Sequence, residues 1–294
     1  MLVPSDLAIS TATLEQAQKL GAWAEREGWS PGTGDIEAFY AADPEGFLVG
    51  HIQDRMVAAA SAVRYDRDFA FCGFYIVEPD LRQQGLGHVI ADAALQRVGS
   101  LVAGLDGVAA QVANYETLGF VFAHWTSRFS GRVSDVVSKI SMPAGIQVVD
   151  VDAESSLFAE VIAYDTAHVP APRAKFVSQW LQPNSPRRSF AALRDGAFAG
   201  YATVRPTTSE GARIGPLFAD DEEVARALLI RCAQQARAWG GTIAIDVPDR
   251  NSAAVALAKE CGMVAAFTCA RMYRGAEPVL PHNEIWGSTT FELG

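Results

Sequence analysis

A short glycine-rich run in the first half of the sequence has the composition of an anion-binding loop. It reads Arg82-Gln83-Gln84-Gly85-Leu86-Gly87 and joins a predicted strand ending at Val77 to a predicted helix over residues 88–98. Glycines at such a turn leave backbone N–H groups free to point at one phosphate, with the helix dipole behind them. Arg82 adds a charge that can pair with a second phosphate. The loop therefore predicts a site for a phosphorylated ligand.

Two familiar nucleotide-binding motifs do not fit this loop. A P-loop needs a lysine followed by serine or threonine after its second glycine, and a dinucleotide loop needs a third glycine where this chain has Ile90. On these residues alone, a glycine-rich turn without any ligand stays open as the alternative.

The elements around the loop are predicted from hydrophobic periodicity and from turn residues. Thr13 can cap a helix over residues 14–27, and three apolar runs at hairpin spacing predict an antiparallel meander. A strand over 101–108 and a helix that ends at Gly119 follow the loop. The remaining predicted segments of this half are a strand at 7–10, a helix at 35–41, the meander strands at 46–51, 56–64 and 69–77, and two closing segments at 120–129 and 133–140.

The second half repeats the order of these elements. Its clearest echo is Ala258-x-x-x-Gly262-Met263-Val264 against Tyr115-x-x-x-Gly119-Phe120-Val121. The predicted segments are strands at 146–151, 190–193, 198–205, 212–218 and 242–247, and helices at 156–164, 174–181, 221–239 and 252–261. We therefore predict an α/β (α+β) fold with two tandem domains, residues 1–142 and 143–294, each a mixed, mostly antiparallel sheet flanked by helices.

The motifs of the first half resemble those of the GNAT superfamily of acyl-CoA N-acyltransferases. The match consists of Val77-Glu78-Pro79, then R-x-x-G-x-G, then Y-x-x-x-G-F, and with the element order it covers residues 7–140. The resemblance implies two GNAT-like domains and acetyl-CoA as co-substrate. It implies that the loop residues 82–87 bind the pyrophosphate. Backbone groups of Ile76 and Val77 would then contact the acetyl and pantetheine end, in a V-shaped opening beside their strand.

Acetyl transfer to an amine also needs a proton donor for the departing thiolate. The resemblance gives this role to Tyr115, whose phenol is protonated at neutral pH. The alternative is that Tyr115 only packs its helix against the sheet.

The base that accepts the proton of the amine is harder to identify, because the strand over residues 69–77 carries no carboxylate. Glu78 and His124 are candidates by position, and His124 is also a candidate for substrate contact. Some tandem GNAT aminoglycoside acetyltransferases use the chain terminus, which points to the carboxylate of Gly294 at the end of an apolar tail expected to dock. In this family the first two helices shape the substrate side, which indicates Trp29; both it and His124 could instead be structural.

The corresponding region of the second half has a different composition. Four acids, Asp220-Asp221-Glu222-Glu223, stand at the helix start, and a capping box from Asp220 to Glu223 would occupy the free N–H groups. Ala258 takes the place of the tyrosine, although Asn251 matches an asparagine that many GNAT helices use on pantetheine. This half therefore resembles a degenerate GNAT domain that has lost cofactor binding. Its expected role is to form one wall of the substrate cleft. The residues after Gly275 are expected to return toward the first domain.

The charge and composition of the chain argue against some classes of binding partner. The formal net charge of −10 argues against nucleic-acid or anionic-membrane binding. Scattered cysteines and histidines predict no metal site and no disulfide framework, and the first residues lack the features of a signal peptide, so a cytoplasmic location is expected. The sequence leaves open whether the chain forms a homodimer.

The function expected from these residues is acetyl-CoA-dependent N-acetylation of a primary amine on a small molecule, such as an amino acid, a polyamine or an aminoglycoside-like cation. Two alternatives stay open. One is a non-catalytic acyl-CoA-binding or regulatory protein, and the other is an acetyltransferase of protein N-termini or lysines.

Overall fold

A mixed β-sheet runs through both halves of the chain. The computed structural model describes residues 6–209 and 211–294, so the first five residues, for which no signal peptide is predicted, lie outside it. Within the described residues the sheet has 13 strands in the order β1-β2-β3-β4-β5-β12-β6-β11-β10-β9-β8-β7, with β13 paired to β10 beside this path. The strands are β1 (Ala8–Thr11), β2 (Phe47–Ile52), β3 (Arg55–Arg64), β4 (Phe69–Val77), β5 (Val102–Val108), β6 (Val121–Arg132), β7 (Ile146–Val151), β8 (Arg188–Arg194), β9 (Ala197–Pro206), β10 (Ala212–Ala219), β11 (Thr242–Pro248), β12 (Val264–Arg274) and β13 (Ile285–Gly287).

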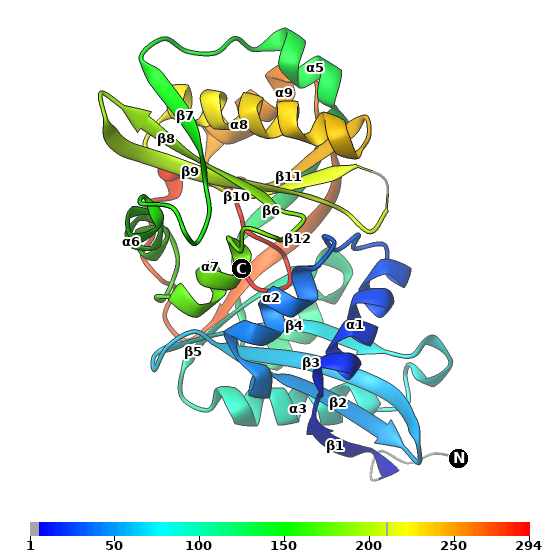
Figure 1. Cartoon of the computed structure of the whole chain (residues 1–294). Coiled ribbons are helices and arrows are strands. Elements are labelled where there is room, and N and C mark those ends of the chain that lie inside the picture. The colour runs from blue at the N-terminus through cyan, green and yellow to red at the C-terminus, as the bar shows by residue number, and fades with distance from the viewer. Residues whose placement is uncertain (1–5, 210) are drawn as a thin grey trace.

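Helices lie on both faces of this sheet and fill the space between its two halves (Figure 1). They are α1 (Leu14–Arg26), α2 (Asp35–Ala42), α3 (Leu86–Val98), α4 (Val112–Thr117), α5 (Val133–Lys139), α6 (Phe158–His168), α7 (Ala174–Trp180), α8 (Glu222–Ala236) and α9 (Ser252–Glu260). In the middle of the molecule α2 packs on α7, where the rings of Phe39 and Trp180 stack with centroids 6.0 Å apart. Among the described residues, no helix has both the length and the apolar content to cross a membrane.

The two halves exchange strands at the centre of the sheet. β12 lies between β5 and β6 and pairs antiparallel with both, while β6 pairs antiparallel with β11. A strand from near the C-terminus therefore completes the sheet of the first half, and a strand of the first half completes the sheet of the second. Backbone pairing thus crosses the division that the sequence suggests between residues 142 and 143.

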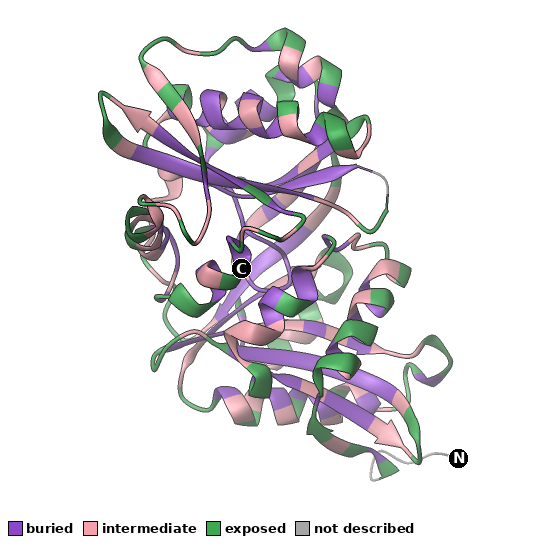
Figure 2. Cartoon of the chain, viewed as in Figure 1, coloured by how far each residue is buried: buried purple, intermediate pink, exposed green. Residues whose placement is uncertain are grey.

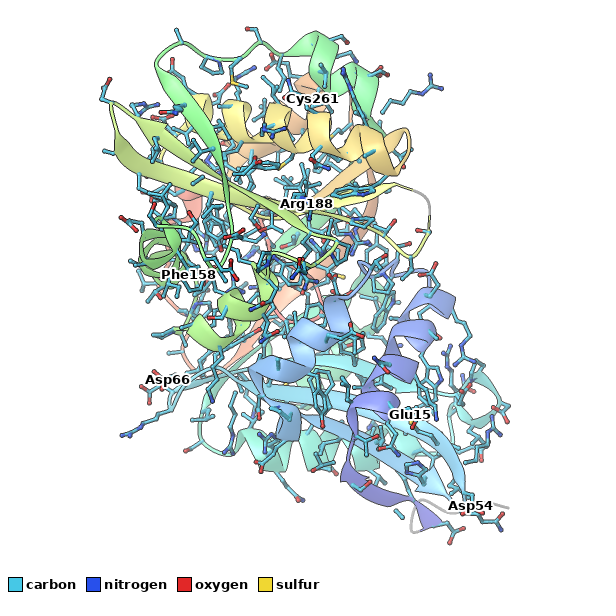
Figure 3. The ribbon with its side chains drawn as sticks, viewed as in Figure 1. Glu15, Asp54, Asp66, Phe158, Arg188 and Cys261 are labelled. Atoms are coloured by element: carbon cyan, nitrogen blue, oxygen red, sulfur yellow. The ribbon has the colours of Figure 1, made fainter. Side chains whose placement is uncertain are left out.

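Burial follows this shared architecture. Figure 2 shows the buried residues concentrated along the central strands and at the junction of the two halves. One core cluster combines residues of α1, α2 and β2 with residues of α7 and β9, so the halves share part of their hydrophobic core. In contrast, Figure 3 shows Glu15, Asp54 and Asp66 at the periphery, where they are exposed to solvent.

The local predictions from periodicity and capping are largely confirmed. Strands β2, β3 and β4 form the predicted antiparallel meander. Thr13 caps α1 through the full capping box, because its Oγ1 accepts from Gln16 N at 3.2 Å and Gln16 Oε1 accepts from Thr13 N at 2.8 Å. The segment 133–140, predicted only to close the first half, forms α5, whose Val133 and Val136 are buried in the core of the second half.

Candidate active site

A large cleft opens beside β4, where this strand parts from its parallel neighbour β5. The two strands pair only from Phe69↔Val102 to Cys72↔Leu105. Just beyond, Phe74 has a φ of 47° and the register of β4 against β3 shifts, so the strand bends away. A left-handed backbone is unfavourable for phenylalanine and marks a locally constrained site. The cleft has a volume of about 680 Å³ and corresponds to the V-shaped opening that the family resemblance implied.

The glycine-rich loop ends at the start of α3, which faces this cleft. Gly85 is the N-cap residue of α3 with a φ of 85°, a left-handed conformation that favours glycine, and no side chain caps the helix. The first N–H groups of the helix are therefore left to a ligand or to water, at the positive end of the helix dipole. This arrangement fits the pyrophosphate of CoA.

The predicted cofactor-binding residues fall into two groups in the structure. Six of them line the cleft: Ile76, Val77, Arg82, Gln83, Gly85 and Gly87. Gln84 points elsewhere, because its Nε2 donates to Asp80 O at 3.3 Å, and the side chain of Leu86 is buried in the core of the first half. A contact from either of these two residues to a ligand in the cleft would have to come from the backbone.

Arg82 is held at the cleft by interactions with the protein itself. Its guanidinium pairs with Glu27 at the end of α1, and its Nε donates to Val77 O at 2.9 Å. Glu27 and Arg82 both line the cleft. An incoming phosphate would therefore compete with the Glu27 carboxylate for the same guanidinium.

Tyr115 also lines the cleft, and its surroundings keep its phenol protonated. The ring lies against Gly107 of β5, where an added Cβ would be 2.2 Å from Tyr115 Cε2. Burial raises the pKa of the phenol above its ordinary value, and the neighbouring Tyr75 and Cys269 raise it further. A protonated hydroxyl in this position can donate to a leaving thiolate. The sequence analysis did not single out Tyr75, whose hydroxyl lies beside Gly87 on the same wall.

Trp29 and Glu78 occupy different positions relative to the cleft. Trp29 lines it, and its carbonyl oxygen accepts from Arg128 Nη1 and from Arg213 Nη2, both at 2.9 Å. Glu78 lies outside the cleft lining and forms an ion pair with Arg26 at 3.0 Å. The structure thus places Trp29, but not Glu78, in the lining of the large cleft.

His124 and Gly294 border a second, much smaller cavity of about 40 Å³. His124 is 6% exposed, and burial together with nearby arginine charges lowers its pKa to about 2, so it is neutral at physiological pH. The oxygen of Gly294 accepts from Arg173 Nη1 at 3.0 Å. The apolar tail does dock as predicted, because residues 285–293 are buried, but neither of these two residues lines the large cleft.

Several cleft residues come from places that the sequence analysis did not connect with the site. They are Ser61 on β3, Phe267 on β12, and Phe291 and Glu292 in the C-terminal tail. The rings of Phe267 and Phe291 meet edge to face at 5.8 Å, and Arg128 lies over the ring of Phe291 at 4.8 Å. No local sequence signal could have found the last three, because they reach the cleft only through the strand exchange and the route of the tail.

The corresponding opening of the second half is filled by the chain itself. β10 and β11 are parallel and pair from Ala212↔Ile243 to Ile214↔Ile245, and β13 then pairs with β10 where an opening would begin. Trp286 of β13 is 4% exposed and donates from Nε1 to Ala219 O at 3.1 Å. Within the described residues, β13 and Trp286 thus occupy the position beside β10 that corresponds to the large cleft of the first half.

The start of α8 also differs from the predicted capping box. The cap is Asp221 rather than Asp220, because the helix begins at Glu222 and Asp221 Oδ1 accepts from Val224 N at 3.1 Å. Asp220 instead accepts from the Tyr164 hydroxyl at 2.7 Å. Arg194 pairs with Asp221 at 2.6 Å. The prediction that an acid caps this helix is confirmed, but the predicted capping box is wrong: the cap lies one residue later, and Val224 at N3 has no polar side chain to return the hydrogen bond.

Asn251 has a structural role in this chain. Its Oδ1 accepts from Ala254 N at 2.9 Å and caps α9, while its Nδ2 donates to Asn283 O at 3.0 Å and to Ile285 O at 3.2 Å. The side chain therefore fixes the segment that leads into β13. All of its described hydrogen bonds are made to the protein backbone.

Comparison with known proteins assigns the chain to a protein family. Residues 11–120 match the acetyltransferase (GNAT) family, and residues 161–287 match a second acetyltransferase (GNAT) domain. A holothin acyltransferase from Pseudoalteromonas sp. (strain SANK 73390) is 32% identical over 283 residues, covering 96% of this chain and 93% of that protein. The chain belongs to the GNAT acyltransferases and carries two GNAT domains in tandem.

Solved structures of low sequence identity share the complete fold. A protein from Pyrococcus horikoshii superposes with a TM-score of 0.80 at 20% identity, covering 100% of this chain and 98% of that one. A tandem GNAT protein from the clavulanic acid biosynthesis pathway superposes with a TM-score of 0.67 at 16% identity, covering 93% of this chain and 99% of that one. The tandem arrangement is thus found in other solved proteins.

Proposed function

We propose that this acyltransferase transfers an acetyl group from acetyl-CoA to the primary amine of a small molecule, such as an amino acid, a polyamine or an aminoglycoside-like cation. The observation that carries the proposal is the uncapped start of α3, which faces a cleft also lined by Tyr115. An acyl-CoA could bind there with its pyrophosphate on the helix start and its thioester beside β4, within reach of a phenol that can protonate the thiolate.

The two halves would have different roles in cofactor binding. We propose that residues 1–142 bind acetyl-CoA and that residues 143–294 do not, with one cofactor bound per chain. The filled opening between β10 and β11 supports this division, as does the occupied helix start at Asp221. The second half would contribute by supplying β12 and the tail to the cleft wall.

The lining of the cleft supports a small acceptor. Trp29, Phe267 and Phe291 line it together with the proposed catalytic groups, which suits a compact molecule held among aromatic rings. The relative from Pseudoalteromonas is named for holothin. Holothin therefore belongs among the acceptors to be tested, beside simple amines.

The test is release of free thiol from acetyl-CoA, measured against a panel that includes amino acids, spermidine, an aminoglycoside and holothin. We expect acetyl-CoA to raise the melting temperature and at least one acceptor to release thiol. Gly87→Glu should abolish the acetyl-CoA-induced rise, because it places a carboxylate where phosphate would bind. Gly241→Glu controls for the added carboxylate alone, since an added Cβ there has nothing within 4 Å. Gly87→Ala controls for crowding, because a Cβ at Gly87 would lie 2.4 Å from the Tyr75 hydroxyl oxygen.

The alternative functions give different results in the same experiment. A rise in melting temperature without thiol release from any acceptor would favour a non-catalytic acyl-CoA-binding protein. Thiol release with peptides but not with small acceptors would favour acetylation of protein N-termini or lysines. A Gly87→Glu variant that keeps the full acetyl-CoA-induced rise would contradict the binding site itself.

A further inference from the structure

The C-terminal tail passes close to a glycine at the register shift of β10 and to another at that of β4. After β13, an added Cβ on Gly215 of β10 would be 2.1 Å from Thr289 O. Three residues further along, an added Cβ on Gly73 of β4 would be 2.2 Å from Glu292 O. Such contacts are only compatible with glycine. The route of the tail therefore fixes Glu292 beside β4, at the point where β4 has just left β5.

Glu292 belongs to the lining of the large cleft, and its carboxylate has a buried oxygen without a partner. The residue is 3% exposed, and its buried Oε1 accepts no hydrogen bond. Ser61, which pairs with Gly73 across β3 and β4, is fully buried and lines the same cleft with an unpartnered Oγ. Unpartnered buried polar atoms are costly, so proteins rarely keep them without a ligand. Glu292 Oε1 and Ser61 Oγ are therefore available to a ligand group that reaches this wall of the cleft.

The charges around Glu292 leave it without an ion-pair partner. Asp246 on β11 pairs with Arg128 on β6 at 2.7 Å, and Asp35 on α2 pairs with Arg205 on β9 at 2.8 Å. Arg213 on β10 donates from Nη2 to Trp29 O, while its buried Nε and Nη1 have no hydrogen-bond partner. No ion pair within 4.0 Å joins it to Glu292 among the described residues, although its charge lowers the pKa of Glu292.

The protonation of Glu292 reflects these surroundings. Burial raises the pKa of its carboxyl above the ordinary value, while Arg213 and Arg128 lower it and Asp35 and Asp246 raise it. A carboxylate with a raised pKa is a stronger base than an exposed glutamate.

We infer that Glu292 binds the amino group of the acyl acceptor and takes its proton during transfer. In this step the amine nitrogen attacks the thioester carbonyl carbon, the C–S bond breaks, and an amide forms. The N–H proton passes to the Glu292 carboxylate, and the CoA thiolate takes a proton from Tyr115. The inference rests on the proposed function and names the base that the sequence did not identify.

The other carboxylates considered for this role lie elsewhere. Glu78 is engaged by Arg26 outside the cleft lining, and the Gly294 terminus lies by the small cavity, where Arg173 donates to its oxygen. Each already has a cationic partner. Glu292 differs from both because it combines a place in the cleft with an unpartnered oxygen.

The test compares Glu292→Gln with Glu284→Gln, a matched change in the same part of the chain. Glu284 pairs with His168 at 3.0 Å and lies outside the cleft lining. We expect kcat/KM for the best acceptor to fall by a factor of about 10²–10⁴ in Glu292→Gln and to stay near wild type in Glu284→Gln. Both variants should keep the rise in melting temperature that acetyl-CoA causes.

Two further readouts separate a base from a structural residue. A carboxyl group whose pKa is raised by folding destabilises the folded state once it is ionised. The melting temperature of Glu292→Gln should therefore not fall below that of wild type at pH 8. The difference between variant and wild type should be more positive at pH 8 than at pH 5. The acid limb of the wild-type pH–kcat profile should disappear in Glu292→Gln and persist in Glu292→Asp, which keeps a carboxylate.

The outcomes distinguish this inference from the proposed function. Wild-type protein that releases no thiol with any acceptor overturns both. Active wild type with a Glu292→Gln variant that keeps at least a third of its kcat/KM overturns the inference alone. The same holds if deleting Gly294 abolishes turnover while Glu292→Gln stays active, since the terminal carboxylate would then be the base. A loss of kcat/KM confined to Glu292→Gln, in a variant whose melting temperature is not lower than that of wild type, supports it.

Discussion

The close approach of the tail to β4 can be tested by adding one methyl group. In Gly73→Ala the new Cβ would lie 2.2 Å from Glu292 O and 3.2 Å from Ser61 Oγ, whereas ordinary contacts begin at 3.4 Å. The carbonyl belongs to a buried backbone segment and cannot rotate away as the end of a flexible side chain would. The tail must therefore move by about 1 Å relative to β4, on the scale of misplacements that matter for catalysis.

The expected size of the effect follows from this displacement. Overpacking of a buried site costs about 1–3 kcal/mol of the free energy of unfolding. A shift of about 1 Å in a reacting group lowers the rate by about 10²-fold, which corresponds to roughly 2.7 kcal/mol of transition-state stabilisation. We therefore expect a folded protein with a lower melting temperature and about 10²-fold lower kcat/KM for the acceptor.

The assay is acceptor-dependent thiol release, with thermal melting in parallel. Gly241→Ala serves as the control, because an added Cβ there meets nothing within 4 Å. If Gly73→Ala acts by displacing Glu292, it should cause little further loss in a Glu292→Gln background, because coupled residues are not additive. A folded Gly73→Ala protein with turnover within threefold of wild type would refute the reasoning.

Two further changes test the acid and the anchoring of the tail. Tyr115→Phe removes the proton donor while keeping the ring that packs on Gly107, so kcat should fall by about 10²–10⁴ with an unchanged melting temperature; an unchanged kcat would assign Tyr115 to packing alone. Asn251→Ala removes a helix cap and leaves two backbone carbonyls without their donor, so we expect about 2–4 kcal/mol lower stability in denaturant unfolding. Unchanged stability with weaker acetyl-CoA binding would instead indicate contact with pantetheine.

The features that the sequence predicted well depend on neighbours along the chain. The capping box of Thr13 is one example, because both of its hydrogen bonds join residues three positions apart. The loop before α3 is another, since its glycine conformation and the exposed helix start are local backbone properties. The error of one residue at Asp221 is of the size expected where four consecutive acids could each cap the same helix.

The features that the sequence missed depend on contacts between distant segments. Phe267 reaches the cleft only because β12 inserts between β5 and β6, and Glu292 only because the tail crosses β10 and then β4. From the sequence we predict no strand over residues 264–274, where β12 forms, and only a returning segment after Gly275. The neighbours of such segments could not be assigned either, because backbone pairing is available to any strand with free N–H and C=O groups.

The sequence by itself predicted the glycine-rich loop, most of the order of the elements and the helix start at which we propose that an anion binds. These follow from backbone conformation and from charge within a few residues. Only the tertiary structure decided which opening stays free and which is filled, because the C-terminal segment can occupy one opening and line the other. The same packing brings Glu292 to the cleft, since its position is fixed by the close contact of its backbone with Gly73 rather than by its place in the sequence.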